Sequence, residues 1–344
     1  MKRHGKDLSR DSMAKDFLPE RRSLLKGLTS AAGAAGLGLA GIQPARGMAL
    51  RLSTDAVDCC TIIDVDRCTG CGACVTACRD RNLAGLPIPR KPIPRPVPSW
   101  KPIIDWSERQ DVTSRLTPYN WLYIQSCTLS GRREGHKVFM PRRCLHCLNP
   151  QCVSLCPSGA ARQSPQGAAY IDESMCLGDG SCHRACPWGI PQRQSGVGPY
   201  LKIAPRYIGY GLVFKCDYCR SLLEEGQTPA CVAACPSGAQ SIGPRNKMVV
   251  RAKEMASLRR GELFGLTENG GTNTIYVSSI PFRDIEAAML QQGQVDIGQP
   301  SLRPARASME KENSLLDLVL AAPLAGAALA SLRLWRDRRK ERKP

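Results

Sequence analysis

The sequence predicts a loop-rich α+β fold with a partly inorganic core, and three observations support this. Only 5% of the 344 residues are aromatic, whereas the chain contains 31 Gly and 26 Pro. Fifteen of its 18 cysteines fall into four short groups. Such a protein buries little apolar surface, and ligation of a metal group can supply part of the missing folding free energy.

The four cysteine groups have the spacing of iron–sulfur ligands. The first reads Cys68-Thr-Gly-Cys71-Gly-Ala-Cys74-Val-Thr-Ala-Cys78, which is C-x₂-C-x₂-C-x₃-C. In this pattern the first three thiolates bind one cluster, and the fourth, one helical turn later, binds a different one. The other candidate ligands are Cys144, Cys147, Cys152 and Cys156; Cys176, Cys182 and Cys186; and Cys216, Cys219, Cys231 and Cys235.

Other uses of these cysteines fit less well. Structural zinc prefers two separated cysteine pairs, which the third cysteine at x₂ and the closing Cys-Pro do not supply. Disulfides between cysteines this close in sequence would be strained. A Rieske centre needs two histidines at fixed offsets; His146 and His183 do not supply them, and we interpret both as groups beside the ligands or on the surface. Cys59, Cys60 and Cys127 lie outside the pattern and are treated as non-ligands.

The net charge of +18 does not indicate nucleic-acid binding. Much of the positive charge lies in the two ends and in a proline-rich segment, and no base-reading motif accompanies it. A positive surface that faces a membrane or an acidic partner is the better interpretation.

Residues 1–49 are predicted to be a twin-arginine signal peptide. Arg21 and Arg22 open an Arg-Arg-Ser-Leu-Leu-Lys core, and an uncharged stretch rich in Ala, Gly and Leu follows over 27–42. This route exports folded proteins, which suits clusters that are assembled in the cytoplasm. The alternative is a disordered basic head with a short buried helix.

Residues 50–250 are predicted to be the cluster-binding domain, with a long insertion at 79–143. Strands are expected at 61–66 and at 170–172, each just before a cysteine group. Alternating prolines make 86–98 extended, as in polyproline II, and we interpret it as an arm that covers a partner. Several aromatic residues follow this arm. They are expected either to contact a partner or to pack on the protein's own core, and they are Trp100, Trp106, Tyr119, Trp121 and Tyr123.

The last quarter of the chain changes character. Residues 251–313 contain no cysteine and are expected to be an extension or linker, with a helix at 248–258 and a strand at 274–278. Residues 314–336 are predicted to be a transmembrane helix, because 315–335 would span about 30 Å. The basic tail at 337–344 would then be cytoplasmic. An interfacial or a buried helix is the alternative.

With all four groups placed, the chain resembles the four-cluster iron–sulfur subunits of respiratory molybdopterin oxidoreductases and membrane-bound hydrogenases. The similarity is strongest over 61–83, 138–192 and 214–250. The whole plan most resembles the periplasmic ferredoxin-like subunit of hydrogenase-2-type uptake hydrogenases, and the iron–sulfur subunit of periplasmic formate dehydrogenase is the nearest rival. The resemblance implies a double ferredoxin-like fold, in which each of two modules binds two [4Fe-4S] clusters.

The resemblance also implies that the groups share clusters crosswise. The implied ligand sets are Cys68, Cys71 and Cys74 with Cys235; Cys216, Cys219 and Cys231 with Cys78; Cys144, Cys147 and Cys152 with Cys186; and Cys176 and Cys182 with Cys156. The last set lacks a cysteine, and Asp179 stands in its position. This site is expected to hold a [3Fe-4S] cluster, which we favour, or a [4Fe-4S] cluster with an oxygen-ligated iron. An Asp179 that points to solvent is compatible with the three-iron case.

The resemblance implies an electron-transfer subunit rather than an enzyme in its own right. The expected partners are a periplasmic catalytic subunit, with a hydrogenase favoured, and a quinone-reactive membrane subunit. No catalytic residue is predicted, because no acid–base pair, nucleophile elbow or phosphate loop accompanies the cysteines. The contrasting hypothesis is a self-sufficient reductase that binds a flavin or substrate at 241–313, and no Gly-rich nucleotide motif supports it.

Overall fold

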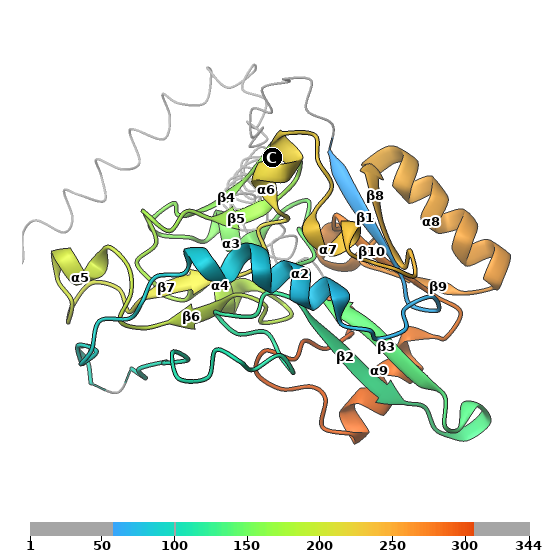
Figure 1. The fold of residues 1–344 in the computed structure, drawn as a ribbon, viewed down its shortest axis with the longest axis horizontal. Helices are drawn as coiled ribbons and strands as arrows, with labels where there is room; N and C mark the ends of the chain where they lie inside the picture. Colours follow the sequence, from blue (N-terminus) through green and yellow to red (C-terminus); the bar gives the residue numbers. More distant parts are fainter. Residues whose placement is uncertain (1–57, 100, 306–344) are drawn as a thin grey trace, which may run out of the picture. The chain divides into compact units, whose positions relative to one another are not determined.

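The computed structural model describes residues 58–99 and 101–305 (Figure 1). The predicted signal peptide at 1–49, transmembrane helix at 314–336 and basic tail at 337–344 lie outside the described residues, as does Trp100. Across the described residues, no helix has the length and apolar character needed to cross a membrane.

The described chain alternates short helices and strands with long loops, which confirms the loop-rich α+β prediction. The strands are β1 (Cys59–Asp64), β2 (Tyr123–Thr128), β3 (Lys137–Arg142), β4 (Ala161–Gln163), β5 (Ala169–Ile171), β6 (Gln192–Gln194), β7 (Leu212–Phe214), β8 (Gln240–Pro244), β9 (Glu262–Phe264) and β10 (Thr274–Ser278). The helices are α2 (Ala73–Asn82), α3 (Gln151–Ser154), α4 (Ser181–Ala185), α5 (Tyr200–Ile203), α6 (Arg220–Glu224), α7 (Ala230–Ala233), α8 (Arg245–Arg259) and α9 (Phe282–Gln291). Short 3₁₀ segments are η1 (Leu83–Gly85), η2 (Gly131–Arg133) and η3 (Glu268–Gly270).

A four-stranded mixed sheet, in the order β8-β1-β10-β9, organises the core. Strand β1 pairs antiparallel with β8 and parallel with β10. Helix α8 covers one face of this sheet and buries Met248, Ala252 and Ala256, which recur every four residues on one side of the helix. On the other face Ile63 and Tyr276 belong to the main apolar core. Both faces of β1 and β10 are therefore buried.

The elements expected from the sequence are confirmed with small shifts of boundary. The strand expected at 61–66 is β1, which begins at Cys59 and ends at Asp64, where the chain turns toward the first cysteine group. The strand expected at 170–172 is β5, one residue earlier. The helix expected at 248–258 lies within α8, and the strand expected at 274–278 is β10.

Residues 251–305, the described part of the expected cysteine-free extension or linker, form regular structure that packs into the core. This segment supplies β9, β10 and α9, and all five residues of β10 are buried between β1 and β9. Helix α9 turns Phe282, Ile285 and Met289 into the main core. The prediction missed this because Thr274 and Ser278, which look like surface residues in the sequence, are buried by sheet pairing.

Part of the predicted insertion is regular structure. Helix α2 continues to Asn82, and β2 and β3 form an antiparallel hairpin. Three aromatic residues of the insertion pack on the protein's own core: Tyr123 is fully buried, Tyr119 is buried, and the ring of Trp121 stacks on Phe214 with centroids 6.3 Å apart. Of the two interpretations of these residues, packing on the core is the one that the structure supports.

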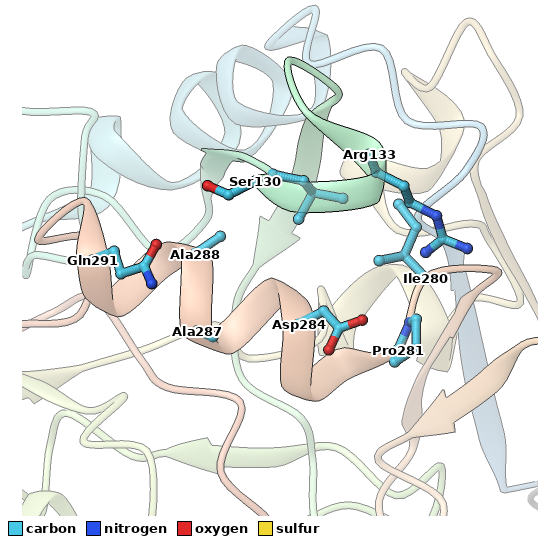
Figure 2. Close-up of a pocket in the computed structure, with 9 residues that line it drawn as sticks. Ser130, Arg133, Ile280, Pro281, Asp284, Ala287, Ala288 and Gln291 are labelled. Atoms are coloured by element: carbon cyan, nitrogen blue, oxygen red, sulfur yellow. The ribbon is translucent and has the colours of Figure 1, made fainter.

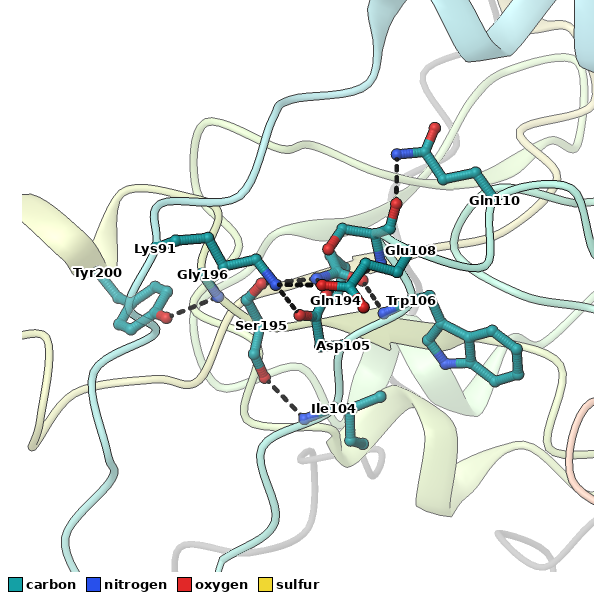
Figure 3. A network of polar contacts seen from close by, with 11 residues as sticks. Lys91, Ile104, Asp105, Trp106, Glu108, Gln110, Gln194, Ser195, Gly196 and Tyr200 are labelled. Carbon is teal, nitrogen blue, oxygen red and sulfur yellow. Dashed lines mark hydrogen bonds and ion pairs between the residues drawn. The ribbon is translucent and has the colours of Figure 1, made fainter.

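The proline-rich arm at 86–98 covers residues of its own chain rather than extending freely. The backbone N–H of Arg90 donates to the carbonyl of Gly196 at 2.7 Å, and the N–H of Val97 donates to Arg206 at 2.7 Å. Figure 3 shows the polar network beside this arm, in which Lys91 pairs with Asp105 and Asp105 accepts a hydrogen bond from Gln194. The insertion is thereby tied to strand β6 and the loop that follows it.

Candidate iron–sulfur centres

Four cysteines from the two ends of the cluster-binding region surround one cavity. Three of them are Cys68, Cys71 and Cys74, and the fourth is Cys235, which lies far along the chain. The cavity has about 280 Å³ of empty space, open solvent included, and lies between the first cysteine loop, α2 and the turn after α7. The structure thus brings together the first ligand set that the resemblance implies.

A second cavity, with about 380 Å³ of empty space, is lined by Cys144, Cys147, Cys152 and Cys186. These residues come from the loop before α3, from α3 itself and from the end of α4. This is again an implied set, with three cysteines of one group and the last cysteine of another. None of the fifteen candidate ligands forms a disulfide.

Members of the other two implied sets also lie close to one another. Helix α2 packs against α7, and burial raises the pKa of Cys78, which the nearby thiols of Cys231 and Cys219 raise further. Burial likewise raises the pKa of Cys182 to about 12, and the nearby Cys176, Cys152, Asp179 and Cys156 raise it further, in decreasing order. Each such shift reports thiols that lie close enough to repel one another as thiolates.

Helix α2 places two cysteines of one group beside different neighbours. The helix starts after Gly72, which has a φ of 78° and ends the preceding loop. Cys74 and Cys78 are spaced i and i+4, so both lie on the same buried face, one turn apart. Cys74 faces the cavity with Cys235, and Cys78 lies with Cys219 and Cys231.

The four cysteine loops share a backbone feature that the sequence did not reveal. In each loop the residue before the second ligand position has a positive φ: 71° at Gly70, 51° at His146, 66° at Gly178 and 66° at Tyr218. Two of these are not glycine, and non-glycine residues rarely adopt this conformation. Asp179 follows such a residue, Gly178, and therefore stands where the other three loops have their second cysteine.

Hydrogen-bond donors surround the sulfurs, which is what thiolate ligands require. Burial alone would raise the pKa of Cys156, but hydrogen bonds from Ala161 and Ser158 outweigh it and hold this pKa below the usual thiol value. At Cys235 the turn that begins at Ser237 does the same. These two turns are the repeated Cys-Pro-Ser-Gly-Ala stretches of the sequence, and the residues present therefore fit iron–sulfur groups.

Amide side chains add two further contacts to sulfur. Asn82 donates to Cys78 Sγ at 3.5 Å, and Asn269 donates to Cys147 Sγ at 3.4 Å. Sequence reasoning assigned no role to either amide. Asn82 lies four residues after its cysteine, a helical spacing that was visible in the sequence, whereas Asn269 reaches its sulfur through a tertiary contact.

The Asp179 carboxylate is engaged by its own loop. It accepts hydrogen bonds from the Ser181 backbone N–H, at 3.1 Å, and from the Ser181 hydroxyl, and its Oδ2 lies 3.7 Å from Arg184 Nη2. The side chain is 37% exposed. The carboxylate thus engages the first residue of α4, and its charge also contributes to raising the pKa of the Cys176 and Cys182 thiols.

The remaining candidates lie outside the cysteine-lined cavities. Cys59 and Cys60 are in β1, and the thiol of Cys127 in β2 points to the carbonyl of Ile285. His183 Nδ1 is 2.7 Å from the carbonyl of Pro191, whereas His146 is fully buried beside Cys216. His146 therefore lies beside the ligands, in agreement with one of the two interpretations offered for it.

A larger pocket lies elsewhere and contains no cysteine (Figure 2). It is formed by the turn after β2 and by α9, with Leu129, Ile280 and Ala288 as apolar lining and Arg133 and Asp284 as charged lining. Among the described residues, no three His, Cys, Asp or Glu side chains converge on the position of a single metal ion.

Comparison with protein families defines the class. Residues 67–160 and 136–245 each match a model described as a 4Fe-4S dicluster domain. Together these matches contain all fifteen candidate ligands. The chain is therefore a ferredoxin-like iron–sulfur protein with two dicluster domains.

Curated relatives identify the family. Over 265 residues the chain is 28% identical to the hydrogenase-2 operon protein HybA of Escherichia coli O157:H7, covering 67% of this chain and 72% of the relative. It is 32% identical over 187 residues to YnfG, a probable anaerobic dimethyl sulfoxide reductase subunit of E. coli K12, and 30% identical over 202 residues to the B subunit of anaerobic dimethyl sulfoxide reductase from the same strain. These alignments cover 53% and 57% of this chain, and 71% and 78% of the relatives. The protein belongs to the iron–sulfur electron-transfer subunits of respiratory oxidoreductases.

Proposed function

We propose that this subunit carries electrons between a periplasmic catalytic subunit, with a hydrogenase favoured, and a quinone-reactive membrane subunit. The observation that carries the proposal is the crosswise lining of two cavities, each by three cysteines of one group and the last of another. Similarity to a hydrogenase-2 operon protein over two thirds of the chain favours a hydrogenase. When bound, iron–sulfur clusters supply one-electron oxidation and reduction, and the chain supplies ligands, hydrogen bonds and burial.

We assign four ligand sets, which are those implied by the resemblance. They are Cys68, Cys71, Cys74 and Cys235; Cys78, Cys216, Cys219 and Cys231; Cys144, Cys147, Cys152 and Cys186; and Cys156, Cys176 and Cys182 with Asp179 beside them. The first and third line cavities, and the thiols of the second and fourth lie close together. We assign three [4Fe-4S] clusters to the all-cysteine sets and a [3Fe-4S] cluster to the fourth.

The test of function uses the purified, cluster-loaded protein without partners. We expect it to accept and return electrons with artificial dyes but to show no turnover of hydrogen, formate or dimethyl sulfoxide. Addition of the catalytic subunit encoded beside it should couple substrate oxidation by that subunit to reduction of this protein. Substrate turnover by the isolated protein would overturn the proposal in favour of a self-sufficient reductase.

The alternative catalytic partner is a molybdopterin oxidoreductase, such as formate dehydrogenase. Similarity of about 30% to subunits of dimethyl sulfoxide reductases favours this alternative. Reduction of this protein by hydrogen only in the presence of a hydrogenase subunit distinguishes the two, because a molybdopterin partner would leave hydrogen unused.

We also propose that the protein is exported by the twin-arginine route and anchored by a helix at 314–336, with the cluster-binding body in the periplasm. The support is the arginine pair at 21–22 and the apolar stretch before the basic tail. Changing Arg21 and Arg22 to Lys should leave the protein in the cytoplasm with its clusters intact. In spheroplasts, protease should digest the body and spare a tag on the tail, and the opposite pattern would reverse the proposed topology.

A further inference from the structure

Two buried cations lie between the Cys144 group and the Cys216 group, and each donates to a sulfur of the group that it does not precede. Arg143 directly precedes Cys144, yet its Nη1 donates to Cys231 Sγ at 3.5 Å. Lys215 directly precedes Cys216, yet its Nζ donates to Cys144 Sγ at 3.6 Å. The side chains are 1% and 5% exposed. Each cation is therefore placed by one cysteine group and touches a sulfur of another.

Two aromatic side chains, His146 and Tyr218, also connect the Cys144 and Cys216 groups. The rings of His146 and Tyr218 stack, with centroids 4.3 Å apart and planes 20° from parallel. His146 Nδ1 accepts the backbone N–H of Ala169 at 3.1 Å, so the ring proton belongs on Nε2. Nε2 lies 3.5 Å from Cys216 Sγ and donates to it. Three donors thus cross between the Cys144 and Cys216 groups.

The partners of the two cations are sulfurs, carbonyl oxygens and aromatic faces. Lys215 Nζ also donates to the carbonyls of Ala169 and Cys216, the latter at 3.1 Å. The guanidinium of Arg143 lies 5.4 Å from the centre of the Tyr218 ring, and its Nε and Nη2 have no hydrogen-bond partner among the described residues. A buried charge needs a compensating charge. Here the thiolates of the neighbouring ligand sets supply it.

We propose that Arg143 and Lys215 each raise the reduction potential of the iron–sulfur centre whose ligand sulfur they contact. Lys215 acts on the set of Cys144, and Arg143 acts on the set of Cys231. This inference rests on the ligand sets proposed above. Both residues are positioning residues, because they act through the ligand sulfurs.

The physical reason is electrostatic. One-electron reduction adds a negative charge, and a fixed cation within hydrogen-bond distance of a ligand sulfur stabilises that charge strongly where water is excluded. Net charge, hydrogen bonds to sulfur and burial are the properties by which a protein sets such potentials. Each cation therefore raises the potential of the ligand set that it contacts.

The test is a redox titration of the cluster-loaded protein followed by EPR spectroscopy. Lys215→Gln should lower the midpoint potential of the centre whose signal is lost in Cys186→Ser. Arg143→Gln should lower that of the centre whose signal is lost in Cys78→Ser. Lys215→Arg and Arg143→Lys keep the charge and should leave these potentials near the wild-type values. Lys253→Gln removes an exposed charge from α8 and should shift no potential.

Unchanged midpoints in both Gln variants, with wild-type iron content, would overturn the proposal. An equal fall in all centres would also overturn it, because a local cation cannot act equally on all of them. If a Gln variant loses iron, the charge-keeping variant decides. A lowered midpoint there contradicts a role for the charge, whereas restored iron content together with a wild-type midpoint supports it. Failure of the ligand sets would appear separately, in the signals and iron contents of the two Cys→Ser variants.

Discussion

Asp179 shows how a single substitution within a repeated loop changes what the loop offers to a metal. The preceding residue, Gly178, has the same left-handed backbone as its counterparts in the other three loops. The side chain, however, is held by Ser181 and Arg184 at the start of α4. A carboxylate that is already engaged and partly exposed is a poor replacement for a thiolate, which favours three iron atoms at this site.

The variant Asp179→Cys tests this directly. The oxidised wild-type protein should give the near-isotropic EPR signal of a three-iron cluster, and Asp179→Cys should abolish it and add about one iron atom per protein molecule. Asp179→Asn is the control, because it removes the charge without supplying a thiol and should retain the signal. Absence of the signal from aerobically prepared wild-type protein that has full iron content would contradict the proposal.

Gly178 itself is required for a second reason. A Cβ at this position would lie 2.4 Å from the carbonyl oxygen of Gly211, a backbone atom that cannot move alone. Gly226 has a similar φ of 71° but no atom within 4 Å of its would-be Cβ. Gly226 therefore requires glycine only because of its positive φ, whereas Gly178 requires it both for its positive φ and for lack of space.

We expect both Gly178→Ala and Gly226→Ala to lower the free energy of unfolding by about 1–2 kcal/mol, because alanine is strained in the left-handed backbone conformation. Gly178→Ala should lose about 1–3 kcal/mol more, because the loop must move away from Gly211. Thermal unfolding of the two cluster-loaded variants measures the difference. Equal melting temperatures would show that the close approach to Gly211 is unimportant.

Among the elements, the proline-rich arm depends on a small polar network for its attachment. Asp105 accepts hydrogen bonds from Gln194 and from the Ser107 backbone, and it pairs with Lys91 on the arm (Figure 3). Burial alone would raise the pKa of Asp105, but the hydrogen bonds from Lys91 and Ser107 outweigh it and hold this pKa well below its usual value. The ionised carboxylate therefore stabilises the docked arm.

Replacing Asp105 by Asn should loosen the arm. At neutral pH we expect faster trypsin cleavage within 86–101 in Asp105→Asn than in wild type. Glu108→Gln is the control, because Glu108 is 90% exposed and lies 4.0 Å from the same lysine. Because the folded pKa is depressed, the stabilisation is present above the unfolded value of about 4 and is lost as the pH falls below it. Equal cleavage rates in the two variants would contradict a specific role for Asp105.

Across the described residues as a whole, segments distant in sequence build each centre. Strand β1 precedes the first cysteine group and β8 follows the last, and the two pair antiparallel. This pairing, with the packing of α2 on α7, brings Cys68 and Cys235 to one cavity. The two ends of the cluster-binding region therefore meet, and the cavity lined by Cys68 and Cys235 depends on both of them.

Cys235→Ser tests this dependence on both ends. It should remove or alter the same EPR signal as Cys71→Ser, whereas Cys219→Ser should affect a different one, and the iron content should fall by about one cluster. Cys127→Ser is the control, because Cys127 is buried in β2 away from the cavities and should leave iron content unchanged. Loss of one common signal in Cys235→Ser and Cys219→Ser would refute the crosswise assignment.

The sequence alone was sufficient to predict the chemistry and the class, because ligand spacing is a local property. The motif from Cys68 to Cys78, the Cys-Pro turns and the missing cysteine at Asp179 are each read within a few residues. The strand that became β10 and the helix that became α8 were also predictable, since β10 is a short run of β-branched and aromatic residues and α8 is a long stretch without Gly or Pro.

The tertiary structure decided everything that depends on which distant segments meet. It placed Arg143 and Lys215 on sulfurs of groups other than their own, which no spacing reveals because each cation precedes a different cysteine. It buried Thr274 and Ser278 by pairing β10 between β1 and β9, and it turned the Asp179 carboxylate toward Ser181. Such contacts depend on packing across the fold, and the physical reason is that a side chain's partners are set by three-dimensional neighbours rather than by its position along the chain.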